Sequence, residues 1–302
     1  MCRKDILLLL TLFIFFVGYE FHRFEPIFND GEDARYAKVM IDGINDVDDR
    51  GYTQLMVAAM RGQIDSLRRV LGVGGDVNAT TSEGETALML SIRNGHYYTS
   101  VQLIKAKSNL NHANIHGMTA LIMSISSGYQ DIALSLIDNG ADPNVMLKDG
   151  STALIVAAQS GSVNIVRALL DHGAAINFRS KAGETALMFA SAAGHSQVIS
   201  VLVERGADIE AKNSKGYSSL LFAALRGNSE VIEALLLHGA DVDARDKYGV
   251  SAIQFCMESS NQHCVDVLAS RGAELPTFGF SLSAEVWRKR EEFMNQKRSA
   301  LS

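Results

Sequence analysis

The sequence returns to a related six-residue segment every 33 residues. The segments read GYTQLM, GETALM, GMTALI, GSTALI, GETALM, GYSSLL and GVSAIQ, and they start at residues 51, 84, 117, 150, 183, 216 and 249. Equal steps without insertion or deletion indicate a tandem repeat array, which takes precedence over any other prediction of fold. We divide residues 51–281 into repeats 51–83, 84–116, 117–149, 150–182, 183–215, 216–248 and 249–281.

The repeat at 183–215 shows what each unit must form. Thr185 is suited to cap a helix, because its hydroxyl can accept from the free N–H groups of a first helical turn. Apolar residues at helical spacing follow, Gly194 interrupts them, and a second apolar pattern ends at Gly206, where positive φ is common. Each repeat is therefore predicted to be helix, turn, helix and loop. Such a unit cannot bury its own apolar face, so neighbours must stack and share a core.

Three motifs recur in these units: the G-x-T-A-L opening, an A-A-x-x-G turn, and a closing G-A-D. The turn occurs in VAAMRG at 57–62 and FAALRG at 222–227, and the closing motif in GADPN at 140–144, GADIE at 206–210 and GADVD at 239–243. With the 33-residue period, these motifs resemble ankyrin repeats. The resemblance implies an all-α ankyrin-repeat solenoid of stacked helix-turn-helix units with β-hairpin-like loops. The chain departs from the glycine pattern at Lys107 and Ser260.

The first residues are of another kind. Arg3 and Lys4 precede an apolar run over residues 6–19, and acidic residues follow it, which is the orientation of an exported segment. As a helix, the run reaches about 21 Å against a hydrocarbon core of about 30 Å, a length that favours a signal peptide. Phe16, however, fits a cleavage site poorly. Residues 1–24 are predicted to be a signal peptide or a membrane anchor, with a hydrophobic segment packed on the protein as the remaining alternative.

Both ends of the array are predicted to carry capping helices, because a terminal repeat needs a polar outer face or a cap. Residues 25–50 are predicted to be a linker and an N-terminal capping helix, in which Tyr36, Val39 and Met40 share one face. Residues 282–302 are predicted to be a C-terminal capping helix that begins at Ser283. An amphipathic helix that binds a partner is the alternative for this segment.

Motifs of catalysis are absent from the sequence. It contains no phosphate-binding glycine loop followed by Lys and Ser/Thr, no H-E-x-x-H and no G-x-S-x-G. His112 and His116 have the spacing of zinc ligands on a helix, but the repeat register places them in a loop without a third ligand. We therefore expect no enzyme activity, no cofactor and no metal. The net charge of −6 argues against nucleic acid as a partner.

The cysteines are too few for a disulfide framework. They are Cys2, Cys256 and Cys264. The last two occupy positions that are small or apolar in other repeats, which favours two buried free thiols. If the domain is exported, a disulfide between them is the alternative.

Partner binding is the function that the resemblance implies, through the hairpin tips and the exposed face of each first helix. Aromatic and arginine residues dominate interface hot spots, and at these positions they gather in two patches. The C-terminal patch consists of Lys215, Tyr217, Leu225, Arg226, Lys247 and Tyr248, and the N-terminal patch of Tyr52, Met60, Arg61 and Arg93. The middle is predicted to be a shallow trough of small and polar residues.

The sequence thus predicts a non-catalytic protein–protein interaction scaffold that is exported, periplasmic or extracytoplasmic, or tethered to a membrane by its N-terminal segment. One alternative is a cytosolic-facing adaptor anchored at a membrane. Another is an accessory or regulatory subunit of an enzyme, with a small-molecule site in the trough. The identity of the protein partner does not follow from the residues, because repeat surfaces differ only in local side chains.

We expect a reporter that is active only after export to become active when it is fused behind residues 1–30. The physical reason is the basic flank before the apolar run and the acidic flank after it, which orient the segment for export. Reporter activity in whole cells measures the outcome. A reporter that stays in the cytosol contradicts both the signal-peptide and the anchor interpretations.

Overall fold

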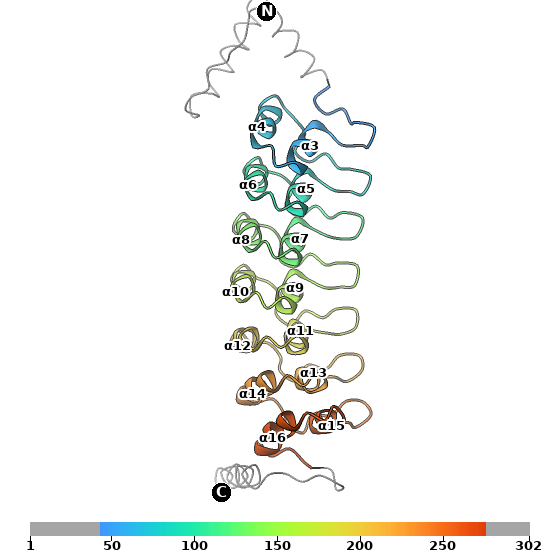
Figure 1. Cartoon of the computed structure of the whole chain (residues 1–302), viewed down its shortest axis with the longest axis vertical. Coiled ribbons are helices and arrows are strands. Elements are labelled where there is room, and N and C mark those ends of the chain that lie inside the picture. Colours follow the sequence, from blue (N-terminus) through green and yellow to red (C-terminus); the bar gives the residue numbers. More distant parts are fainter. Residues whose placement is uncertain (1–42, 276–302) are drawn as a thin grey trace, which may run out of the picture. The chain divides into compact units, whose positions relative to one another are not determined.

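The computed structural model describes residues 43–275, and these form helices and loops without a β-strand. The predicted N-terminal segment, nearly all of its neighbouring capping helix, and the predicted C-terminal helix lie outside the described residues. Within the described part, fourteen helices form seven consecutive pairs (Figure 1). Their bounds are α3 (Gln54–Met60), α4 (Ile64–Gly72), α5 (Ala87–Arg93), α6 (Tyr97–Lys105), α7 (Ala120–Ser126), α8 (Gln130–Asp138), α9 (Ala153–Gln159), α10 (Val163–Asp171), α11 (Ala186–Ala193), α12 (Ser196–Glu204), α13 (Ser219–Arg226), α14 (Ser229–Leu237), α15 (Ala252–Glu258) and α16 (Gln262–Ser270).

The pairs stack in sequence order. The odd-numbered helices, which we call the inner helices, contact one another along one row, and the even-numbered outer helices contact one another along a second row. Figure 1 shows the connecting loops projecting beyond the inner row. Every inner helix begins 33 residues after the previous one, as does every outer helix. The all-α solenoid that the sequence predicts is therefore the observed fold.

One continuous apolar core runs through the stack. The second residue of each inner helix is at most 1% exposed, and these residues are Leu55, Leu88, Leu121, Leu154, Leu187, Leu220 and Ile253. Each of them packs in the cluster that its neighbours in the preceding and following pairs share. No pair has a core of its own, so burial of apolar surface, the main favourable contribution to folding, couples every pair to the next.

Threonine side chains cap four of the seven inner helices in the described part of the chain, among them α11, where the sequence predicts a cap. The Thr185 hydroxyl accepts from the backbone N–H of Met188 at 3.4 Å, and the threonines before α3, α5 and α7 cap in the same way. The loop before each inner helix is a tight turn that is closed in five places by a single antiparallel bridge, such as Val47 with Thr53. Asn213 holds one such turn by accepting from the backbone N–H groups of Lys215 and Tyr217. The loops are thus fixed by their own side chains.

Lys107 and Ser260 adopt the left-handed backbone conformation although neither residue is a glycine. Gly206 has φ of +91°, as its place after α12 predicts, and Lys107 and Ser260 have φ of +60° and +56° at positions where other copies have glycine. The left-handed region costs a non-glycine residue about 1–2 kcal/mol. The repeat geometry is therefore kept at these two positions in spite of the local cost.

A ladder of side chains links each loop to the next. The residue at one position in every loop accepts a hydrogen bond from the backbone N–H that lies 31 residues later, at 2.7–2.9 Å. The acceptors are Asn45, Asn78, Asn111, Asn144, Asn177, Glu210 and Asp243. Because a side chain of one unit satisfies the backbone of its neighbour, the ladder fixes the spacing of the loops.

A second set of contacts explains two histidines that sequence reasoning left without a role. The Nε2 atom of His195 lies 3.0 Å from the backbone carbonyl oxygen of Gln159, and His96 makes the same contact with Met60. A Cβ atom on Gly161 would lie 2.7 Å from the His195 ring, so this turn has room only for glycine. Each histidine therefore joins the turn of one pair to the inner helix of the preceding pair.

The cysteine pair differs from the expectation of free thiols. Cys256 in α15 and Cys264 in α16 are buried and joined by a disulfide, with Cα atoms 5.7 Å apart. That separation lies in the usual range for disulfides. Sequence position showed that both residues are buried, but it could not show that the two helices bring the sulfur atoms together.

Among the described residues, no helix has the length and hydrophobicity needed to cross a membrane.

Replacing Asn144 by alanine should lower the free energy of unfolding by about 0.5–1.5 kcal/mol, the usual net contribution of a hydrogen bond. Asn144 accepts from the N–H of Ala175 at 2.9 Å and donates to the carbonyl of Gly173 at 3.1 Å, so the change removes two contacts between units. Urea unfolding followed by circular dichroism measures the effect. Asn164→Ala, an exposed position on α10, is the control, and an equal loss in the control would contradict the role of the ladder.

Candidate functional site

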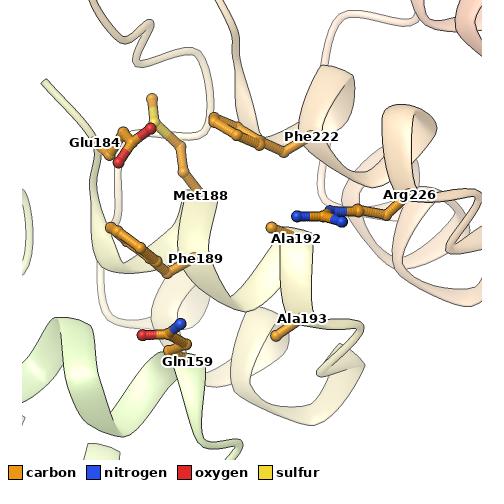
Figure 2. A pocket seen from close by; sticks show the side chains of 8 residues that line it. All are labelled: Gln159, Glu184, Met188, Phe189, Ala192, Ala193, Phe222 and Arg226. Carbon is orange, nitrogen blue, oxygen red and sulfur yellow. The ribbon is translucent and has the colours of Figure 1, made fainter. Parts of the chain in front are cut away.

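A hollow lies on the inner helices of the fourth to sixth pairs. Its volume is about 300 Å³, at the lower end of the range for ligand pockets. Figure 2 shows Phe189 of α11 and Phe222 of α13 on either side of Met188, with Ala192 and Ala193 beside them and the guanidinium group of Arg226 pointing toward Ala192. Its lining is Gln159, Glu184, Met188, Phe189, Ala192, Ala193, Phe222 and Arg226. The site is apolar at its sides and carries one cation and one carboxylate.

Phenylalanines occupy the same position in three consecutive inner helices. Phe189, Phe222 and Phe255 are each separated by 33 residues and each is half-buried against the core. Tyr217 joins two of them, since its ring lies 5.7 Å from Phe222 and 5.9 Å from Phe255 in edge-to-face contacts. Such pairs stabilise by about 0.5–1.5 kcal/mol beyond their buried area. Tyr217 therefore supports Phe222, one of the two phenylalanines of the hollow.

The structure connects the predicted C-terminal patch through α13 and two loops. Lys215 and Lys247 lie in adjacent loops, joined by a bond from the N–H of Lys247 to the carbonyl of Lys215 at 3.5 Å. The Lys247 ammonium lies 5.0 Å from the centre of the Tyr248 ring, and that ring is 76% exposed. Leu225 is 46% exposed. Tyr217, in contrast, is a half-buried packing residue, so its side chain offers less surface than the sequence suggested.

The predicted N-terminal patch is divided. Tyr52 and Arg93 line a smaller hollow of about 160 Å³, whereas Met60 and Arg61 are not part of its lining. Tyr52 and Met60 are half-buried against the core, and Arg61 is exposed. Arg93 forms an ion pair with Glu85, whose side chain is 5% exposed. Arg93 is therefore already occupied by a carboxylate of its own chain.

Sequence reasoning missed the two phenylalanines that flank the hollow. It described the middle of the array as a shallow trough of small and polar residues. The aromatic residues lie at positions 189 and 222, and their recurrence after 33 residues was the signal available in the sequence. The half-buried Ala192 and the exposed Ala193 have small side chains beside two large ones, which leaves a hollow above the alanines.

His112 and His116, whose spacing resembles that of zinc ligands, take part in hydrogen bonds of the loops. His112 contacts the backbone carbonyl of Gly84 through Nε2 at 2.9 Å, which holds it in the inter-unit loop. Across residues 43–275, no group of three or more His, Cys, Asp or Glu side chains is arranged to hold a metal ion.

We expect Arg93→Ala to lower the free energy of unfolding by about 1–3 kcal/mol, because it leaves the buried Glu85 carboxylate without its partner. The estimate is below that for a fully buried pair, since the Arg93 side chain is 53% exposed. Thermal and urea unfolding give the change. Arg61→Ala, at an exposed arginine without an ion pair among the described residues, should have little effect. Adding Glu85→Gln to Arg93→Ala should recover stability, and a failure to recover it would contradict this explanation.

Comparison with known protein families identifies the same repeats. A family model described as ankyrin repeats (3 copies) matches residues 55–146, 135–213 and 208–278, which together cover well over half of the chain. A search of the curated proteins found no significant match. Ankyrin repeats generally mediate protein–protein interaction, and their fold is typically non-catalytic. The chain belongs to the ankyrin-repeat family.

Proposed function

We propose that the repeat domain is a non-catalytic scaffold that binds a partner protein through its loop tips and inner-helix face. The observation that carries this proposal is the hollow on the inner helices, together with exposed apolar side chains on α13 and on the loop before α15. Leu225 and Tyr248 are large and exposed, yet they project from helices and loops that are fixed by the continuous core and the ladder. Rigid anchors of this type lose little entropy on binding, and tyrosine and arginine are enriched in hot spots.

The C-terminal patch is the better candidate of the two. Arg226 forms no ion pair within residues 43–275, whereas Arg93 of the N-terminal patch pairs with Glu85. An unpaired guanidinium beside an apolar hollow can bind a partner's carboxylate without first breaking a contact of its own. We therefore place the main contact on α11, α13 and the loops that precede α13 and α15.

We also propose that the domain acts outside the cytosol, either exported or tethered to a membrane. The basic-then-apolar N-terminal sequence supports this proposal, as does the disulfide between Cys256 and Cys264. Disulfides persist in oxidising compartments and are rare in the cytosol. Experiments that identify the partner should therefore use intact cells that express the chain with its N-terminal segment.

Crosslinking in intact cells, followed by mass spectrometry, should identify a protein partner, and its affinity can then be measured with the purified chain. We expect the double variant Leu225→Ala and Tyr248→Ala to raise the Kd by about tenfold or more, since each side chain is an exposed anchor. The absence of any crosslinked protein would contradict the scaffold function.

The matched control for this experiment is Tyr98→Ala with Leu237→Ala. Tyr98 is 74% exposed and Leu237 is 66% exposed, but both lie on outer helices, α6 and α14. The control pair removes the same two side-chain types from the opposite row. An equal loss of affinity in the two double variants would show that the inner face is not the binding surface.

A further inference from the structure

Basic side chains gather on the loops before the last three inner helices. At one position of the loop, the residues are Val47, Thr80, Ala113 and Met146 in the first four units, and Arg179, Lys212 and Arg245 in the last three. Lys181, Lys215 and Lys247 lie close to them in the sequence of the same loops, and all six basic residues are exposed. The whole chain has a net charge of −6. The same three loops also carry carboxylates, so the six basic residues form a local group and not a uniformly basic surface; these carboxylates are Glu184, Asp208, Glu210, Asp241, Asp243 and Asp246.

Most of these charges are not neutralised by the chain itself. The Arg179 guanidinium donates to the backbone carbonyls of Gly183 and Lys212, and the Lys212 ammonium donates to the carbonyl of Arg245 at 3.1 Å. In the described part of the chain, Arg245 is the one of the six with a carboxylate partner, Glu274, at 2.9 Å. Within residues 43–275, the other five form no ion pair. Hydrogen bonds thus hold Arg179, Lys212 and Arg245 in place, and five of the six charges remain without an ion pair in the described part of the chain.

The hollow adds an apolar site and a further cation to the same units. Phe189 and Phe222 flank it, and Arg226 lies at one end without an ion pair among the described residues (Figure 2). Glu184 is the one carboxylate of the lining, and it accepts a hydrogen bond from Asn213 at 3.4 Å. A ligand that fits must therefore be apolar at its centre and negative at the Arg226 end.

We propose that this surface binds an extended, acidic segment of a partner protein. The inference rests on the proposed function and names the chemistry of its partner. One bulky apolar side chain enters the hollow between Phe189 and Phe222, and a neighbouring carboxylate pairs with Arg226. Further carboxylates face Lys215 and Lys247 on the adjacent loops. Charge complementarity of this kind gives specificity and raises the association rate more than it raises affinity.

A single-stranded nucleic acid would also be attracted to basic loops, but the aromatic residues are wrongly placed for it. Binding of that kind uses exposed ring faces on which successive bases stack. The three phenylalanines and Tyr217 are half-buried against the core and one another. Tyr248 is largely exposed, and Lys247 lies over its ring. The surface therefore offers an apolar hollow and lacks the row of exposed ring faces that single-stranded nucleic acid needs for stacking.

The test is a selection from a library of random 12-residue peptides displayed on phage, carried out against the full chain. We expect the enriched peptides to contain more Asp and Glu than the unselected library, together with one Leu, Ile, Met or Phe beside an acidic residue. A synthetic consensus peptide with a fluorescent label then gives the Kd by anisotropy. Unlabelled 12-nucleotide oligothymidylate serves as the competing probe.

Two pairs of variants at matching repeat positions locate the bound peptide. Ala192→Phe fills the hollow, and its control is Ser126→Phe, 66 residues earlier on α7. Arg226→Glu reverses the cation, and its control is Arg61→Glu, 165 residues earlier. Ala192→Phe and Arg226→Glu should each raise the Kd of the consensus peptide by about tenfold or more, and the controls should change it little. A peptide with lysine in place of the critical carboxylate should regain affinity for Arg226→Glu.

The inference is overturned if the selection gives no enrichment, if enriched peptides are no more acidic than the starting library, or if each variant and its control weaken binding equally. Tighter binding of oligothymidylate than of the consensus peptide would overturn it in favour of nucleic acid. If the partner found by crosslinking keeps its affinity for Ala192→Phe and Arg226→Glu, the acidic-segment inference is wrong while the scaffold function stands. If no protein crosslinks, the scaffold function itself fails.

Discussion

The contact between one helix pair and the next determines the rest of this structure. Each pair leaves its apolar residues half-covered, and only the neighbouring pair completes their burial, as Leu187 shows between Leu154 and Leu220. The ladder of side chains such as Asn144 gives the same coupling to the loops, where there is no apolar core. Loops that are hydrogen-bonded to their neighbours keep a fixed separation, and a surface composed of several loops can therefore be rigid without a β-sheet.

Much of the fold could be predicted because the residues that begin and end helices recur from unit to unit. Thr185 and Gly206 mark where helices begin and end, and both hold the conformations that these roles require. Lys107 and Ser260 show why the period is better evidence than any single residue, since the backbone keeps its left-handed turn where glycine is missing. The disulfide of Cys256 and Cys264 depends on the separation of two helices, a distance that residue type does not encode.

The sequence predicted one lining residue of the hollow, Arg226, but neither its other residues nor its shape. Arg226 and Leu225 follow from the repeat register, because the register alone determines which residues of an inner helix are exposed. The hollow requires the relative sizes of Phe189, Phe222 and the alanines between them, which come from two different units. Ion pairing also distinguishes the two patches. Arg93 and Arg226 both lie at the end of an inner helix, but only Arg93 has a carboxylate partner in the described residues. Exposure and charge in a single unit therefore do not define a binding surface.

The constant 33-residue step has a consequence for how such a chain can change over evolutionary time. The hollow takes its lining from three consecutive units, from Gln159 on α9 to Arg226 on α13. Loss or duplication of one whole unit elsewhere in the array would alter the length of the stack and preserve this constellation. An insertion of a few residues within these three units would instead shift Phe222 relative to Phe189 and remove the hollow. Selection on the site thus preserves the alignment of the three units that line the hollow, while the number of other units is free to vary.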